Sequence, residues 1–248
     1  MQSTLVIVRH GESTWNQANL FTGWHDVPLS RRGEQEASAA GATLLDADLW
    51  FDVVHTSLLT RATQTAERAL AALGQPWLPV ERSWRLNERH YGALQGLDKK
   101  ETTEKYGPEQ TKLWRRSYDV PPPPVQPGHL EHPSSDLRYR WLAPDVLPGS
   151  ECLKDVVARV LPYWYDAIVP QLRAGWVVLV VAHGNSLRAL VKHLEGIADD
   201  AIAELNIPTG APRLYQFDDA LNVVEATYLG DAEAVAAAAA AVAAQAGA

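Results

Sequence analysis

Two strand-like segments decide the predicted fold, and the first is Leu5-Val6-Ile7-Val8-Arg9-His10-Gly11-Glu12-Ser13. Its apolar part is short, continuous and rich in β-branched residues, which is typical of a strand buried on both faces in a parallel sheet. The second segment lies near the other end of the chain and reads Val177-Val178-Leu179-Val180-Val181-Ala182-His183-Gly184-Asn185-Ser186. In each segment the strand runs directly into His-Gly and then a polar turn. We therefore expect two histidines at the ends of two buried strands.

The remaining apolar pattern alternates between helices and strands. One helix is expected after Ser30, a possible cap, because Ala37, Ala40, Gly41 and Leu44 follow at helical spacing, and a second after Ser57, another possible cap, with Arg61, Thr65 and Leu70. A third is expected over residues 151–172, with a bend at Pro162. A fourth is expected where one face is formed by Leu187, Leu190, Val191 and Leu194. Further strands are expected at Val53-Val54-His55, at Tyr215 to Phe217 and at Val223 to Tyr228. This alternation indicates an α/β fold, a three-layer sandwich with a mostly parallel central sheet flanked by helices.

The length and composition favour a single domain followed by a tail. The chain has 248 residues, 46% of them hydrophobic, which suffices for a core without a metal or disulfide. We expect one domain over residues 1–231, with a lid-like insertion over about 89–150 whose stretch 120–148 is rich in proline. The tail, 232–248, is nearly all alanine and valine, so it is either a marginal helix or disordered. The single cysteine, Cys152, excludes an intrachain disulfide and fits a reducing compartment.

The start of the chain, its hydropathy and its charge exclude some classes of protein. Residues 1–4 lead straight into the first strand without a signal peptide, and no apolar run reaches the ~18 residues of a membrane helix. The formal net charge of -8 argues against broad nucleic-acid binding. We therefore expect a cytoplasmic protein without a membrane or nucleic-acid partner. An anionic small substrate is compatible with this charge, because a cleft responds to the local field.

The two His-Gly strand ends point to phosphoryl transfer. Ligands of open α/β sheets bind at the carboxyl ends of strands, so His10 and His183 are expected to face one pocket. A lone histidine is more often a partly buried structural residue, but the duplication weakens that alternative. Neutral imidazole is a good nucleophile toward phosphorus. His10 is therefore the predicted nucleophile, and His183 a donor to the phosphoryl oxygens.

Cations and a carboxyl group must complete such a site. A transferring phosphoryl group spreads negative charge over three oxygens, which arginine meets with a rigid fork of donors. Arg9 and Arg61 are the candidates, although Arg61 taken alone could be a solvated surface residue. A carboxyl group must also move a proton on and off the acceptor oxygen. Composition and spacing leave Glu88, Glu12 and Glu34 open for that role.

An ordered set of motifs then resembles a known family over nearly the whole chain. The motifs are Arg9-His10-Gly11-Glu12-Ser13-Thr14-Trp15-Asn16, Phe21-Thr22-Gly23-Trp24, Leu86-Asn87-Glu88-Arg89-His90-Tyr91-Gly92-Ala93-Leu94-Gln95-Gly96, Trp114-Arg115-Arg116, Ala182-His183-Gly184-Asn185-Ser186-Leu187-Arg188 and Leu205-Asn206-Ile207-Pro208-Thr209-Gly210. Together they resemble the histidine phosphatase superfamily and, within it, the 2,3-bisphosphoglycerate-dependent phosphoglycerate mutases. The resemblance implies a phosphoglycerate mutase-like fold.

The resemblance also implies the roles of individual residues. It implies a catalytic set in which His10 carries the phosphoryl group, Glu88 gives and takes the proton, and His183 stabilises the transition state beside Arg9 and Arg61. It implies substrate contacts by Arg9, Ser13, Asn16, Thr22, Gly23, Arg61, Glu88, Tyr91, Lys99, Arg115, Arg116, Gly184 and Asn185.

The reaction that the resemblance implies is the interconversion of 3-phosphoglycerate and 2-phosphoglycerate in glycolysis and gluconeogenesis. It would run through phospho-His10 and a 2,3-bisphosphoglycerate intermediate, and the bisphosphate would also prime the enzyme. No metal is implied, and the enzyme would be an isomerase of the intramolecular phosphotransferase class. A homodimer or homotetramer acting on small phosphorylated three-carbon acids is expected.

Two other functions compete with this hypothesis. A phosphatase would use the same His10 and Glu88 with water as the acceptor. The long segment between Glu88 and His183 favours the mutase, because it can exclude water and carry extra cations. A non-catalytic phosphate-binding protein on the same fold would be expected to lack His10 or Glu88, and both are present.

Overall fold

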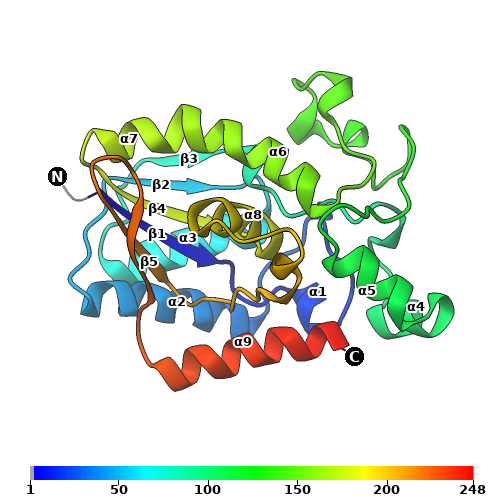
Figure 1. The fold of residues 1–248 in the computed structure, drawn as a ribbon, viewed down its shortest axis with the longest axis horizontal. Coiled ribbons are helices and arrows are strands. Elements are labelled where there is room, and N and C mark those ends of the chain that lie inside the picture. The colour runs from blue at the N-terminus through cyan, green and yellow to red at the C-terminus, as the bar shows by residue number, and fades with distance from the viewer. Residues whose placement is uncertain (1–2, 248) are drawn as a thin grey trace.

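The computed structural model describes residues 3–247 and contains a central six-stranded sheet in the order β3-β2-β4-β1-β5-β6 (Figure 1). The strands are β1 (Ser3–Arg9), β2 (Val53–Thr56), β3 (Val80–Arg82), β4 (Val177–Ala182), β5 (Arg213–Phe217) and β6 (Val223–Tyr228). The four strands β1, β2, β3 and β4 run parallel to one another. At one edge, β5 is antiparallel to β1, and β6 is antiparallel to β5. The predicted mostly parallel sheet is confirmed. The expectations for residues 1 and 2 and for Ala248 lie outside the described residues.

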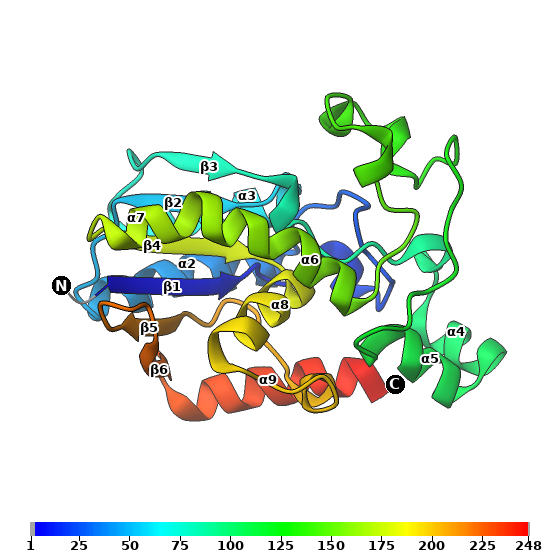
Figure 2. The same ribbon diagram turned by 45° about the horizontal axis from the view of Figure 1, so that its top comes forward.

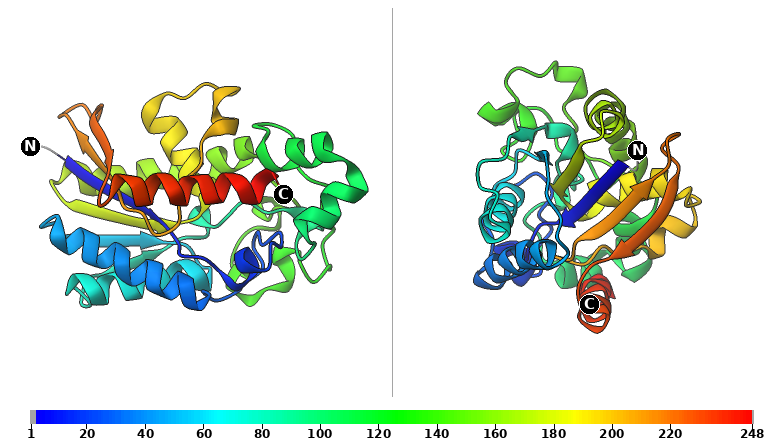
Figure 3. Two further views of the ribbon diagram at one scale, coloured as in Figure 1. Left: turned by 90° about the horizontal axis from the view of Figure 1, so that it is seen from below. Right: turned by 90° about the vertical axis from the view of Figure 1, so that its left-hand side faces the viewer.

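Helices cover both faces of the sheet, as the end-on view in Figure 3 shows. The helices are α1 (Thr14–Gln17), α2 (Arg31–Asp46), α3 (Thr60–Leu73), α4 (Lys99–Tyr106), α5 (Pro108–Arg116), α6 (Leu153–Tyr163), α7 (Val169–Arg173), α8 (Gly184–Glu195) and α9 (Ala232–Gly247). α2 and α3 pack on one face, and α6, α7 and α8 on the other. The predicted three-layer sandwich is therefore confirmed. No helix among residues 3–247 has the length and apolar character needed to cross a membrane.

β1 divides its side chains between the two apolar cores. Leu5 and Ile7 belong to the core under α6 to α8, and Val6 and Val8 to the core under α2 and α3. All four are at most 1% exposed. Burial on both faces explains why the apolar run is continuous rather than alternating. The short edge strand β3 lacks such a signal, since its residues are half-buried or exposed, and the sequence did not predict it.

The predicted cap at Ser30 is confirmed, and the one at Ser57 is wrong. The Ser30 hydroxyl accepts the Gly33 N–H, so it caps α2. α3 begins later than expected, with Leu59 at its N-cap and no side-chain cap from that residue. The Ser57 hydroxyl instead contacts the ring of His183, a partner too distant in sequence for a local pattern to indicate.

The helical segment after residue 151 has the predicted interruption. Pro162 lies inside α6, and a π-helical turn, Trp164–Ile168, follows before α7 begins. Proline cannot donate a backbone hydrogen bond, so the change of helical register directly after it is expected.

The insertion extends the molecule beyond the carboxyl ends of the parallel strands, as Figures 1 and 2 show in green. It contains α4 and α5, then the 3₁₀ turns Pro133–Ser135, Leu137–Tyr139 and Pro144–Val146. The tail forms α9, which runs from β6 back along the molecule toward the insertion (Figure 3). The helical alternative for the tail is thus the one that the structure shows.

α2 approaches the loop after β1 at the backbone of two glycines. A Cβ atom at Gly11 would overlap the carbonyl oxygen of Gly33, and one at Gly33 would overlap that of Glu12. Both overlaps involve backbone, which cannot rotate away. The start of α2 therefore sets the position of the His10-Gly11 turn.

We expect Gly33→Ala to lower the free energy of unfolding by about 1–3 kcal/mol, as overpacking does. Helix propensity alone acts in the opposite direction, since alanine favours helix over glycine by about 1 kcal/mol. Urea unfolding followed by circular dichroism measures the change. Ala39→Gly, at an exposed position of α2, is the matched control and should cost about 1 kcal/mol or less. A Gly33→Ala variant as stable as the parent would contradict the close approach.

Candidate active site

One pocket lies beyond the carboxyl ends of β1 and β4 and gathers most of the predicted site residues. Those that line it are Arg9, His10, Asn16, Thr22, Gly23, Arg61, Glu88, Tyr91, Lys99, Arg115, Arg116, Gly184 and Asn185. Its lining also includes residues that were not predicted as site residues, although five of them stand in the motifs quoted above: Leu20, Phe21, Arg188, Leu205, Asn206, Ile207 and Val242. Two predicted residues, Ser13 and His183, are not part of the lining.

The hydrogen bond of His10 defines which ring nitrogen is available. Nδ1 lies 2.6 Å from the carbonyl oxygen of Gly11, and a carbonyl only accepts, so Nδ1 carries the proton. Nε2 is then the nitrogen with a free lone pair. The ring is 2% exposed, and burial together with the nearby Arg61 and Arg9 holds the His10 pKa well below its ordinary value. The imidazole is therefore neutral at pH 7, as a nucleophile must be.

His183 is fully buried beside His10. The two ring centroids are 4.9 Å apart in an edge-on arrangement. Nε2 of His183 lies 2.7 Å from the Ser57 hydroxyl oxygen, which also accepts the Leu59 N–H. Nδ1 is buried and has no hydrogen-bond partner among residues 3–247. The ring lies at the N-cap of α8 and faces the Ser186 N–H. Burial and Arg61 hold the His183 pKa well below its ordinary value.

Backbone carbonyl groups hold the two arginines that flank His10. Arg9 donates from Nη1 to Ile207 O at 2.8 Å. Arg61, at the start of α3, donates from Nη2 to Gly23 O at 2.7 Å and from Nη1 to His25 O at 3.1 Å. Burial lowers the pKa of both, that of Arg61 to about 10, yet both stay charged at neutral pH. Arg61 is 1% exposed, so the structure excludes the solvated surface alternative.

Glu88 is the carboxyl group that the structure places in the pocket. Its Oε1 accepts the N–H groups of Arg89 at 2.8 Å and Asn185 at 3.0 Å. Its Oε2 has no hydrogen-bond donor among residues 3–247. The two other glutamates are engaged elsewhere: Glu12 accepts from the Ser30 hydroxyl, and Glu34 pairs with Arg68.

Three cations from the insertion also line the pocket. Lys99 begins α4, and Arg115 and Arg116 end α5. Burial and the charge of Arg115 lower the Lys99 pKa to about 8. Burial also lowers the pKa of Arg115 to about 10. Such a group of partly desolvated cations favours a multiply charged anion.

Tyr91 lies among these cations with an unusually acidic phenol. Its oxygen is 3.2 Å from Nη2 of Arg89 and 3.3 Å from Nδ2 of Asn185, and both are donors. Burial would raise the phenol pKa, but Arg89 outweighs it, with help from Arg115, and the pKa falls to about 8. Because the oxygen already accepts two hydrogen bonds, its own proton remains for a bound anion.

Of the lining residues that were not predicted as site residues, Arg188 and Asn206 make hydrogen bonds to predicted ones. Arg188 Nη1 donates to Asn185 Oδ1 at 2.9 Å, which orients the amide. Asn206 Oδ1 accepts from Arg116 Nη2 at 2.9 Å. One signal was present for Arg188, since it lies one helical turn after Gly184 and therefore on the same face of α8.

Ser13, a predicted substrate contact, is not among the residues that line the pocket. Ser13 is fully buried and caps α1, with its hydroxyl donating to Asn16 Oδ1 at 2.9 Å. It therefore supports Asn16 rather than lining the site. Within residues 3–247 there is no cluster of three or more histidine, cysteine, aspartate or glutamate side chains that could hold a metal ion.

Comparison with known proteins identifies the class first. The profile of the histidine phosphatase superfamily (branch 1) matches residues 5–133 and 129–228, so the chain belongs to that superfamily. It also has the fold of the structure described as "Mycobacterial hydrolase 1", with a TM-score of 0.70 at 23% identity over 92% of this chain and 97% of that chain.

The particular family follows from two curated relatives. The chain is 62% identical to a 2,3-bisphosphoglycerate-dependent phosphoglycerate mutase of Leifsonia xyli subsp. xyli, over 97% of this chain and 96% of that protein. It is 58% identical to one of Nitratidesulfovibrio vulgaris, over 98% and 97% respectively. The chain belongs to the family of 2,3-bisphosphoglycerate-dependent phosphoglycerate mutases.

We expect anion affinity to fall as the pH rises through about 8. Lys99 loses its positive charge above its pKa of about 8, and Tyr91 gains a negative charge in the same range, so both changes weaken anion binding. Losing one charge-assisted hydrogen bond corresponds to about tenfold in affinity. Sulfate, which stays a dianion over this range, is the probe, and calorimetry at pH 7 to 9.5 measures its Kd.

Two variants separate the contributions to this pH dependence. Lys99→Arg keeps its charge above pH 8, and Tyr91→Phe cannot ionise, so each should flatten part of the dependence. A sulfate affinity that does not change with pH in the parent chain would contradict the assignment.

Proposed function

We propose that the chain interconverts 3-phosphoglycerate and 2-phosphoglycerate through phospho-His10. The observation that carries the proposal is the hydrogen bond from His10 Nδ1 to Gly11 O, which leaves Nε2 as a neutral nucleophile in a pocket lined by cations. The names of the two relatives, both 2,3-bisphosphoglycerate-dependent phosphoglycerate mutases, support this substrate class.

The cycle begins with priming by 2,3-bisphosphoglycerate. A bond forms between phosphorus and His10 Nε2, the ester P–O bond breaks, and Glu88 gives a proton to the departing oxygen. The free Oε2 of Glu88 is the atom suited to this transfer, because two backbone N–H groups already hold Oε1. This route needs no metal.

The productive steps use the same groups in both directions. The C2 hydroxyl of 3-phosphoglycerate attacks phospho-His10 and passes its proton to Glu88, which yields 2,3-bisphosphoglycerate. That intermediate turns round in the pocket and returns its C3 phosphate to His10. Glu88 then protonates the C3 oxygen and 2-phosphoglycerate leaves.

Charge on the transferring group is met by donors fixed before the reaction. Arg9 and Arg61 are held by backbone carbonyl groups, so their remaining N–H groups need no reorganisation. Such preorganised donors are the main source of catalysis in phosphoryl transfer. His183 would stabilise the transition state, and Asn16 with the Gly184-Asn185 turn would complete the phosphate site.

The distal part of the substrate would contact the insertion. Lys99, Arg115 and Arg116 can offset its carboxylate and second phosphate, while Tyr91 donates its phenol proton. Thr22 and Gly23 line the same region. A monoester phosphatase acting with water has less need of this second set of charges, which favours the mutase over the phosphatase.

Other features of the proposal concern the whole chain. We propose one catalytic domain over residues 1–231, with α9 bordering the pocket through Val242. The enzyme would be a cytoplasmic homodimer or homotetramer that serves glycolysis and gluconeogenesis, with no membrane or nucleic-acid partner.

Incubation with 2,3-bisphosphoglycerate is expected to place an acid-labile phosphate on His10, which mass spectrometry of peptides detects. His10→Ala should abolish labelling and turnover, and Glu88→Gln should slow the mutase reaction by about 10²–10⁴-fold, the range for a general acid–base group. His129→Ala, which alters an exposed histidine of the insertion, is the control and should behave as the parent. Label on another residue would overturn the mechanism, and hydrolysis without formation of 2-phosphoglycerate would favour the phosphatase.

A further inference from the structure

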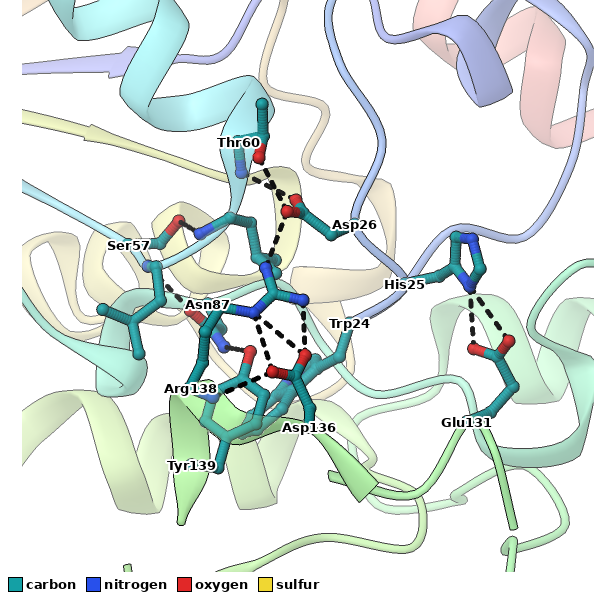
Figure 4. A network of polar contacts seen from close by, with 12 residues as sticks. Trp24, His25, Asp26, Ser57, Thr60, Asn87, Glu131, Asp136, Arg138 and Tyr139 are labelled. Carbon is teal, nitrogen blue, oxygen red and sulfur yellow. Dashed lines mark hydrogen bonds and ion pairs between the residues drawn. The ribbon is translucent and has the colours of Figure 1, made fainter. Parts of the chain in front are cut away.

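Part of the insertion, residues 131–139, is fastened to the loop of residues 22–26 by contacts that the mechanism above does not use (Figure 4). Glu131 Oε1 lies 2.9 Å from Nδ1 of His25, and Arg138 Nη1 lies 2.7 Å from Asp26 Oδ2. Tyr139 is 1% exposed and packs on Trp24, with ring centroids 4.8 Å apart. This loop includes Thr22 and Gly23, which line the pocket, so the contacts lie directly behind the site.

Asp26 performs the capping that Leu59 cannot. Its Oδ1 accepts the Thr60 N–H at 2.7 Å, and its Oδ2 accepts the Thr60 hydroxyl at 2.6 Å. A carboxylate at this place satisfies a free N–H and favours the positive end of the helix dipole. The first turn of α3 therefore depends on a residue 34 positions earlier in the chain.

Arg138 holds the Asp26 carboxylate from the opposite side. Figure 4 shows its guanidinium between Asp26 and Asp136. Asp136 accepts from Nε and Nη2 of Arg138, which leaves Nη1 directed at Asp26. Contacts within residues 131–139 thus orient the guanidinium toward the loop.

Arg61 closes the connection from helix to loop. It follows Thr60 in the first turn of α3, and its two Nη atoms donate to the carbonyl groups of Gly23 and His25. The loop therefore holds α3 through Asp26, and α3 holds the loop through Arg61. Each Nη atom has a second N–H that remains for the pocket, and the direction of these N–H groups depends on how loop and helix are aligned.

We infer that Asp26 and Arg138 are positioning residues that fix the Arg61 guanidinium for phosphoryl transfer and link it to the docked insertion. The inference rests on the proposed function. Arg138 lies 77 residues beyond Arg61 in sequence and is not part of the pocket lining. It acts only through Asp26 and the start of α3.

The pair should affect turnover more than stability. Its side chains are 31% and 24% exposed, and ion pairs this exposed contribute about 1 kcal/mol or less. A displacement of about 1 Å in a catalytic group can instead cost about 10²-fold in rate. The three cations assigned to the distal phosphate, Lys99, Arg115 and Arg116, lie on α4 and α5 rather than on this loop, so we expect KM to change less than kcat.

The test compares Arg138→Ala, Arg138→Lys and Asp26→Asn with the parent chain. We expect Arg138→Ala and Asp26→Asn each to lower kcat for 3-phosphoglycerate about tenfold, with KM changed less than twofold and Tm nearly unchanged. Arg138→Lys keeps the charge without the fork of donors and should recover part of kcat. Arg140→Ala is the matched control, since Arg140 is an exposed arginine directly after residues 131–139 and its guanidinium lies over Trp141.

A second comparison tests the route through Arg61. In an Arg61→Ala background, Arg138→Ala should lower kcat no further, and the double variant of Asp26 and Arg138 should match the worse single variant. A wild-type kcat in folded Arg138→Ala would overturn the inference, and so would an equal loss in the Arg61→Ala background. Loss of kcat in proportion to loss of folded protein would mark a merely structural role and overturn it too.

The same experiment keeps the inference separate from the proposed function. A parent chain that fails to convert 3-phosphoglycerate refutes the mutase proposal by itself. Single-turnover labelling of His10 by 2,3-bisphosphoglycerate and hydrolysis of p-nitrophenyl phosphate also need Arg61 in place. The ratio of each variant's rate to the parent's rate in these two assays therefore tests the positioning role, whether or not the chain is a mutase.

Discussion

The parallel pairing of β1 with β4 is the constraint on which the site depends. Arg9 pairs with Ala182, and the His10 N–H continues the ladder to Ala182 O at 2.9 Å. The two His-Gly turns therefore leave the sheet at the same edge, and the two imidazole rings meet. A shift of one residue in this register would turn the side chains of one strand to the opposite faces and separate the histidines.

The same arrangement places positive charge around a neutral imidazole. Burying Arg9 and Arg61 costs hydration, which backbone carbonyl groups and the Glu88 carboxylate only partly replace. Burial of the His10 ring and the positive field of the two arginines together hold the His10 pKa down, and the same field favours an anion in the pocket. A bound phosphate group would thus offset the positive charge of Arg9 and Arg61, the same charge that helps to keep His10 unprotonated.

The insertion reaches this site from two directions. α4 and α5 bring cations to the pocket wall, and residues 131–139 lie behind the loop of residues 22–26. Residues 131–139 lie within the proline-rich stretch 120–148, and prolines in such a stretch reduce the conformational entropy that is lost when it is held in one conformation. The cations proposed to bind the distal end of the substrate and the residues proposed to position Arg61 therefore lie on one segment of the chain.

The sequence by itself determined the two buried strands, the alternation of helices and strands, and the motifs from which His10, Glu88 and the cations were predicted. The strands and helices could be predicted because burial on a strand or a helix face imposes a short period on neighbouring residues. Glu88 and the cations of the insertion were predicted only because their motifs resemble those of a known family. Only the tertiary structure decided that Asp26 rather than Ser57 caps α3, that Ser13 supports Asn16 outside the pocket, and that Arg138 pairs with Asp26. Those contacts join residues far apart in the chain or depend on where a side chain points once the layers are packed, and no local pattern records either.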